Sequence, residues 1–379
     1  MKALQLIFSK GKYFAPALVF ASINVLFGTW AIYIPRIKST LQIDEGQLGI
    51  AIFCMALGTL TMLLLAPKII RKFGVGKVTG YGIIFFLFSF IIPFIADQYL
   101  WLCAGMFLVG ATSGITDIAM NTLVTEIEKE DQIHIMSSNH GFFSIGGFLG
   151  AGIGSFFLSD TTLPLHHLLV VIGLLFILNI IFLKYYFSSS SKSLEENTFK
   201  IANFKPLFIL AMIGFFVMAS EGAIVDWSAL YLENISLVKA SWVGLGYTAF
   251  SATMAIGRFL GDGISSKFGS KSLLIGGAII GAVGFGCVLL IQPFIVIIGF
   301  ALVGLGLSVI VPQLFRLSGK REGIEPSQGI SFIAGSGFIG FLIGPVFLGF
   351  LADYANLKLS FWALFGFIII ALLMSIKLK

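Results

Sequence analysis

Charged residues are scarce in this sequence: Asp, Glu, Lys and Arg occupy only 11% of its 379 positions, against roughly a quarter in soluble globular domains. Apolar residues make up 58%, and the mean hydropathy is +1.01. This composition excludes a soluble globular enzyme. Twelve membrane helices of about 20 residues would use roughly 240 positions, which leaves short connections and no room for a large domain in water. Function must therefore reside inside the bilayer.

Cysteine is also scarce. Cys54, Cys103 and Cys287 each lie in an apolar run without metal-ligand spacing, so we expect neither a disulfide framework nor a metal site. The sequence contains no Walker loop and no nucleophile–base spacing, which excludes ATP hydrolysis within this chain and argues against an enzyme. We expect no cofactor. The net charge of +6 is interpreted through its distribution across a membrane rather than as a sign of nucleic-acid binding.

Apolar stretches recur along the whole chain and predict twelve membrane helices. The expected spans are 13–35, 47–66, 78–96, 99–124, 137–158, 166–187, 206–232, 241–261, 272–292, 294–316, 327–351 and 358–376. With a cytoplasmic N terminus, 20 of the 24 Lys and Arg residues fall on the cytoplasmic side. Because positive connections resist translocation, we expect an integral protein of a bacterial inner membrane with both termini in the cytoplasm.

One long polar connection divides the predicted spans into two groups of six. Residues 188–205 are Ser-rich and cannot bury enough apolar surface to fold alone. We therefore expect an N-terminal six-helix bundle over residues 1–187, a cytoplasmic linker over 188–205 and a C-terminal six-helix bundle over 206–379.

The two halves repeat each other in sequence. Residues 72–74, Lys-Phe-Gly, recur 195 positions later at 267–269, and Gly146 and Gly150 recur 194 positions later as Gly340 and Gly344. The first span of each half holds a second match. Asn24 and Trp30 are six positions apart, as are Glu221 and Trp227, so we match Asn24 with Glu221 and Trp30 with Trp227. The prediction is an all-α membrane protein of two pseudo-symmetric halves. Such halves can rock about a central site and expose it alternately to either side of the membrane.

Residues 71–77, Arg-Lys-Phe-Gly-Val-Gly-Lys, resemble the basic loop between the second and third spans of the major facilitator superfamily. Residues 267–269 form a weaker second copy. The family pattern has Gly at the position of Pro67 and an acidic residue at that of Arg71, so the charge-pair gate of the family is incomplete here. The resemblance covers the whole chain and implies the twelve-helix fold of that superfamily.

A narrower resemblance is carried by five further segments. They look like the MosC-like, or rhizopine permease-like, branch: Asp117 with Asn121 and Glu126, residues 136–141 (Met-Ser-Ser-Asn-His-Gly), residues 144–147 (Ser-Ile-Gly-Gly), residues 221–223 (Glu-Gly-Ala) and Asp226-Trp227. This branch implies solute transport without fixing a particular solute.

Ionisable groups inside a membrane are costly and usually face a bundle interior or a cavity. Glu221 lies about 24 Å along its span from Lys205 at 1.5 Å per residue, which predicts a position beyond the midplane toward the outside. We interpret it as a site for substrate or a proton, with a structural hydrogen bond as the alternative. Asp226 lies nearer the interface, where substrate contact and a capping role are equally favoured.

Three uncharged residues complete the predicted substrate site. Trp30 and Trp227 have the type and position of interfacial anchors, but inward-facing rings could also stack on the apolar face of a sugar. Asn24 offers a donor and acceptors to a cavity.

Asp117 and Asn121 lie one helical turn apart and share a helix face. His140 begins the next span at a similar depth. An Asp and a His on adjacent helices could relay a proton or pin the two helices together, and the sequence does not choose between these roles.

The predicted gating residues are Lys72, Asn121, Arg258 and Asp262. Arg258 and Asp262 are four positions apart at the expected cytoplasmic end of their span, which favours an intrahelical ion pair.

Together these features predict a monomeric secondary active transporter of a small polar solute, such as a sugar, polyol or inositol-like compound, coupled to protons through Glu221 or Asp117. The alternative is a proton-coupled exporter of drugs or hydrophobic metabolites, which the 40 Phe residues would allow. The expected partners are the solute, protons and membrane lipid, with no nucleic acid.

Overall fold

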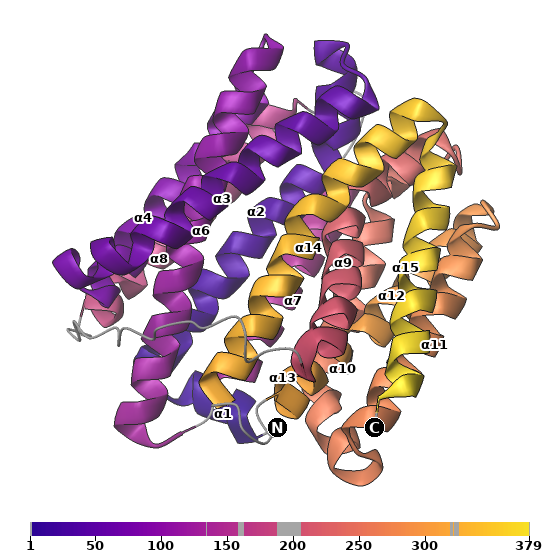
Figure 1. The fold of residues 1–379 in the computed structure, drawn as a ribbon. Helices are drawn as coiled ribbons and strands as arrows, with labels where there is room; N and C mark the ends of the chain where they lie inside the picture. The colour runs from indigo at the N-terminus through magenta and orange to yellow at the C-terminus, as the bar shows by residue number, and fades with distance from the viewer. Residues whose placement is uncertain are drawn as a thin grey trace. The chain divides into compact units, whose positions relative to one another are not determined.

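A computed structural model describes residues 2–133, 135–157, 163–187, 206–318, 321 and 326–378. Every regular element among these residues is helical (Figure 1). The linker predicted over residues 188–205 lies outside the described residues.

The first half of the chain contains eight helices in its described part. They are α1 (Lys2–Ser9), α2 (Gly11–Leu41), α3 (Glu45–Phe73), α4 (Val75–Ser89), α5 (Ile91–Ile95), α6 (Tyr99–Asp131), α7 (Met136–Phe157) and α8 (Pro164–Phe187). The predicted third span is made of α4 followed by α5. The short helix α1 was not predicted.

The second half follows the same order. Its described helices are α9 (Phe208–Asn234), α10 (Leu245–Phe268), α11 (Ser270–Val288), α12 (Pro293–Leu307), α13 (Ile310–Ser318), α14 (Pro326–Tyr354) and α15 (Leu357–Lys377), with a short 3₁₀ turn at Ala240–Trp242. The predicted tenth span is made of α12 and α13.

A helix therefore lies at each of the twelve predicted spans. Ten stretches among the described residues are long and apolar enough to cross a membrane. The other two spans are α7 and α10, which have 22 and 24 residues, so both are also long enough to cross.

The repeated Lys-Phe-Gly motif has a structural reason. Gly74 has φ +86° between α3 and α4, and Gly269 has φ +77° between α10 and α11. A positive φ is readily adopted by Gly because it has no Cβ. The same backbone turn thus joins the same two helices in each half.

By its internal contacts the chain divides into two compact units. The first unit is Met1–Ile43 with Ile50–Glu196, and the second is Asp44–Gly49 with Asn197–Lys379. Residues Asp44–Gly49 were expected in the first bundle but group with the second unit, because contacts rather than chain order define a compact unit.

Glycine contacts hold the long helix pairs of each unit together. In the first unit α2 packs against α7, and in the second α9 packs against α14, where the two helices run side by side in Figure 1. A Cβ on Gly146 would lie under 3.0 Å from the Ala21 carbonyl oxygen, and one on Gly340 equally close to that of Phe215. Small residues of this kind let helix backbones approach closely.

These contacts correct one predicted match between the halves. Gly146 with Ala21 and Gly340 with Phe215 are related by 194 positions in both helices. At this offset Asn24 corresponds to Met218 rather than to Glu221. The side-chain contacts agree, because Asn24 donates to the Phe143 carbonyl at 2.8 Å and Met218 lies against Gly337, which is 194 positions after Phe143.

The same correction applies to the tryptophans. Trp227 corresponds to Tyr33, and Glu221 corresponds to Phe27. The predicted matches of Asn24 with Glu221 and of Trp30 with Trp227 are therefore wrong by three residues, slightly less than one helical turn. A repeat of two similar residues six apart was too short to fix the register.

We predict that Gly146→Ala and Gly340→Ala each lower the melting temperature of the purified protein. The added methyl would meet a backbone carbonyl, and overpacking of this kind costs about 1–3 kcal/mol. Matched controls are Gly173→Ala in α8 and Gly366→Ala in α15, where a Cβ meets nothing within 4 Å. Because Ala is favoured over Gly in a helix, the controls should keep or raise the melting temperature, measured by thermal unfolding in detergent. Equal losses in all four variants would contradict this account.

Candidate functional site

A charge pair joins the middles of two helices in the second unit. Glu221 is the central residue of α9, and Arg258 lies close to the middle of α10. The Arg258 Nη2 atom is 3.7 Å from the Glu221 Oε2 atom, and the two side chains are only 20% and 12% exposed. Sequence spacing did not predict this pair because it joins residues on different helices.

The pair corrects two expectations. Glu221 was expected beyond the midplane, but α9 begins at Phe208 and puts it about 20 Å from either end of the helix. Arg258 was expected at the cytoplasmic end of its span, but α10 continues to Phe268. Arg258 therefore leaves the cytoplasmic charge count. The side chain of its predicted partner, Asp262, lies outside the part of the chain that the structure describes.

The geometry of this pair is loose. Charge-assisted N–H···O contacts are usually 2.7–2.9 Å long, whereas this contact is 3.7 Å. The second carboxylate oxygen, Glu221 Oε1, is buried and has no hydrogen-bond partner among the described residues. A buried polar atom without a partner typically costs about 1–3 kcal/mol. Glu221 thus keeps an acceptor that another group can use.

The pair is present in only one of the two halves. The two halves match at offsets of 194 and 195 positions. Phe27 lies 194 positions before Glu221, and Leu63 lies 195 positions before Arg258, so these two residues are their equivalents in the first half. Two apolar residues therefore occupy the equivalent positions in the first unit. Helix packing alone does not require the two charges in the second unit.

The predicted tryptophans are buried within their own units. Trp30 is 1% exposed, packs its ring 6.1 Å from that of Phe94, and has an indole N–H without a hydrogen-bond partner among the described residues. Trp227 is fully buried and donates its Nε1–H to the Pro345 carbonyl oxygen at 3.1 Å, which ties α9 to α14. Neither ring is exposed at the protein surface, where an anchor at the membrane–water boundary would lie.

Asn24 and Asp226 are also buried, each 4% exposed. Asn24 uses its amide N–H to tie α2 to the Phe143 carbonyl of α7. Asp226 lies on α9, five residues after Glu221. A substrate role for these four buried residues stays a prediction.

Asp117 and Asn121 contact each other as their spacing predicted. Asn121 Nδ2 donates to the Asp117 carbonyl oxygen at 2.9 Å and to its Oδ1 at 3.2 Å. Asp117 is exposed on α6. His140, on α7, places its ring edge-on to Phe20 with centroids 4.9 Å apart. These contacts tie Asp117 to its own helix and His140 to α2, and a relay between them stays a prediction.

Lys72 is the exposed charge among the predicted gating residues whose side chains the structure describes. Lys72, at the end of α3, holds its ammonium 5.2 Å from the ring centre of the adjacent Phe73. An ion pair that the sequence did not predict involves Lys12, whose Nζ lies 2.8 Å from Glu130 Oε2 and 3.1 Å from Asp131 Oδ2. The hydrogen bond from Lys12 lowers the pKa of Asp131. This contact links the start of α2 to the end of α6 within the first unit.

A second missed network lies in the second unit. Arg316 Nη1 donates to Ser265 Oγ, and Ser265 Oγ donates to Gln313 Oε1 at 2.8 Å. This network joins α13 to α10. Within the described residues, no group of three or more His, Cys, Asp or Glu side chains could hold a metal ion.

The fold and site define a class: an integral membrane protein of repeated six-helix halves, with a buried ion pair in one half. The model of the Major Facilitator Superfamily matches residues 15–321 and 212–378. The chain belongs to this superfamily.

Relatives of the whole chain support this assignment. An uncharacterized MFS-type transporter of Yersinia pestis is 28% identical over 345 residues, 91% of this chain and 90% of its own. Membrane protein MosC of Rhizobium meliloti is 26% identical over 345 residues, 90% of this chain and 84% of its own. The predicted MosC-like relationship is confirmed.

Solved transporters share the fold. The nucleoside transporter NupG matches with a TM-score of 0.71 at 12% identity over 98% of this chain and 100% of its own. A bacterial homolog of the human lysosomal transporter Spinster matches with a TM-score of 0.72 at 14% identity over 97% and 96%. The protein is thus an integral membrane transporter of this superfamily, not an enzyme.

A double-mutant cycle tests whether Glu221 and Arg258 stabilise each other. Each single variant removes one charge of the pair and leaves the other in place, and breaking a buried charge pair in this way costs up to about 3–5 kcal/mol. We therefore expect each single variant to lose more thermal stability in detergent than the double variant. Losses that simply add would show that the two side chains do not interact.

Proposed function

We propose that the protein is a secondary active transporter of a small polar solute, working by alternating access and coupled to protons. The carrying observation is the Glu221–Arg258 pair, largely buried near the middle of two helices and with one carboxylate oxygen unsatisfied among the described residues. Membership of a transporter superfamily supplies the general activity. The proposal adds the solute class, the coupling ion and the residues.

Glu221 is the main candidate for the coupling residue. Its charge is balanced by one distant Arg258 contact, so either a proton or Arg258 can compensate the carboxylate. Protonation would remove the charge on Glu221 that attracts Arg258. Such an exchange would link proton binding to a rearrangement of α9 against α10. Asp117 is the second candidate.

We infer the solute class from the hydrogen-bond donors and acceptors of the proposed site. Glu221 Oε1 is a free acceptor among the described residues, and guanidinium and amide groups donate. Hydroxyl groups both donate and accept, so sugars, polyols and inositol-like compounds suit this set. Asn24, Trp30, Asp226 and Trp227 remain proposed contacts to the solute.

We also propose the orientation and setting of the protein. The distribution of Lys and Arg favours cytoplasmic termini in a bacterial inner membrane. We propose bundles over residues 1–187 and 206–379 joined by the linker 188–205, acting as a monomer. Lys72, Asn121, Arg258 and Asp262 are proposed to gate access, and His140 to assist Asp117.

The first experiment finds the solute. Sugars, polyols, amines and drugs are screened by thermal shift with purified protein at two pH values. We expect a polyhydroxy compound to raise the melting temperature. Stabilisation by hydrophobic drugs alone would favour the exporter instead.

The second experiment tests coupling with the solute so identified. In proteoliposomes with an imposed pH gradient, we expect Glu221→Gln to abolish proton-driven accumulation, because the side chain can no longer exchange a proton. Glu233→Gln is the matched control: it makes the same change in α9 at an exposed residue. Asp117→Asn makes the same test in the first unit.

Size-exclusion chromatography establishes that each variant remains folded at the assay temperature. The Glu221→Gln/Arg258→Gln double variant repeats the transport assay with less loss of stability. Unchanged pH-dependent uptake by folded Glu221→Gln would remove Glu221 from the coupling role.

A further inference from the structure

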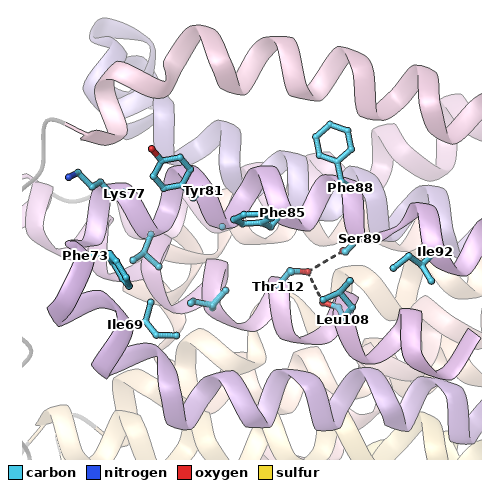
Figure 2. Close-up of a pocket in the computed structure, with 13 residues that line it drawn as sticks. Ile69, Phe73, Lys77, Tyr81, Phe85, Phe88, Ser89, Ile92, Leu108 and Thr112 are labelled. Carbon is cyan, nitrogen blue, oxygen red and sulfur yellow. Dashed lines mark hydrogen bonds between the residues drawn. The ribbon is translucent and has the colours of Figure 1, made fainter. Parts of the chain in front are cut away.

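An apolar groove runs along the first unit, between the end of α3, one face of α4 and the middle of α6. Its volume is about 630 Å³, within the range of about 300–1,000 Å³ that is usual for ligand pockets. Tyr81, Phe85 and Phe88 line it and are 44–66% exposed. In Figure 2 these three rings follow one another along α4.

The hydroxyls of Ser89 and Thr112 in the groove are already paired. Thr112 Oγ1 donates to the Leu108 carbonyl at 2.8 Å and to Ser89 Oγ at 3.1 Å, as the dashed lines in Figure 2 show. Ser89 Oγ donates to the Phe86 carbonyl at 2.7 Å. These hydroxyls hold α4 and α6 together. The groove therefore suits a hydrocarbon chain and not a polar solute.

One end of the groove is basic. Lys77 lines that end, together with Phe73 (Figure 2). Lys77 is exposed and has no ion pair among the described residues. The ammonium of Lys72 lies 5.2 Å from the centre of the Phe73 ring, so a second positive charge is near the same end.

The length of the groove and the position of its basic end both suit a lipid molecule. From Lys77 to Ile92 the helical rise is about 22 Å at 1.5 Å per residue, whereas the whole hydrocarbon core is about 30 Å thick. With the orientation proposed above, the basic end lies at the cytoplasmic surface, where anionic lipid headgroups collect. The apolar part then extends into the membrane.

We propose that this groove is a binding site for an anionic phospholipid of the cytoplasmic leaflet. One acyl chain lies along Tyr81, Phe85 and Phe88, and the headgroup phosphate contacts the Lys77 ammonium. The lipid is held within the first unit and separate from the Glu221–Arg258 pair. Its binding does not depend on the identity of the transported solute.

Native mass spectrometry of the full chain in a neutral detergent tests the proposal. The probes are phosphatidylglycerol, phosphatidylcholine with the same acyl chains, and inorganic phosphate. We expect phosphatidylglycerol to bind most tightly and Lys77→Gln to weaken it about fivefold, which corresponds to about 1 kcal/mol for one basic residue near the membrane surface. Lys267→Gln is the matched control, because Lys267 lies in the second unit and does not line this groove.

A second pair of variants tests the acyl-chain site without changing charge. Leu108 lines the groove and is 40% exposed, whereas Leu100 lies on the same helix outside it and is 76% exposed. We expect Leu108→Trp to reduce retention of both lipids and Leu100→Trp to leave it unchanged.

Three results would overturn the proposal. The first is equal affinity of wild type and Lys77→Gln for phosphatidylglycerol, and the second is full lipid retention by Leu108→Trp. The third is binding of inorganic phosphate as tight as that of the lipid, which would show a simple anion site without a role for the groove.

Discussion

Close contact between helix backbones is the constraint on which the rest of this structure depends. Gly146 lies against the Ala21 carbonyl, and Gly340 lies against that of Phe215, because no Cβ separates the two backbones. Helices in lipid gain no hydrophobic energy from contacting each other, so such packing has to supply the attraction. The contact repeats at 194 positions in both units, and it fixes which faces of α2 and α9 are available for polar groups.

The helix packing is repeated in the two units, but the charge pair Glu221–Arg258 is not. Glu221 and Arg258 occupy positions that Phe27 and Leu63 fill in the other half. A fold built by duplication needs its packing residues twice, whereas a coupling site is needed once. We infer that an ionisable pair kept in one half, despite the cost of burying it, is retained for function and not for stability.

The sequence predicted the helices well and their contacts poorly. Long apolar stretches placed all twelve spans, and the Lys-Phe-Gly motifs marked the turns at Gly74 and Gly269. A helix that is apolar on nearly every face gives no periodic signal of which side meets which neighbour. For that reason the contact of Arg258 with Glu221 on another helix was not predicted, and Lys12 with Asp131 was missed. The register of α9 was placed three residues off for the same cause, since Asn24 and Trp30 offered too short a match.

The unsatisfied oxygen of Glu221 suggests how a single pair could couple two ligands. A buried carboxylate needs compensation, and Arg258 at 3.7 Å supplies it incompletely. A proton on the carboxylate, a solute hydroxyl at Oε1 and a closer Arg258 are three ways to complete it, and they compete for the same two oxygens. Each choice favours a different distance between α9 and α10, because Arg258 is drawn in only when the carboxylate is charged and unoccupied. We therefore infer that proton and solute would act on one helix pair through one side chain, an exchange that Phe27 and Leu63 at the equivalent positions of the first unit cannot make.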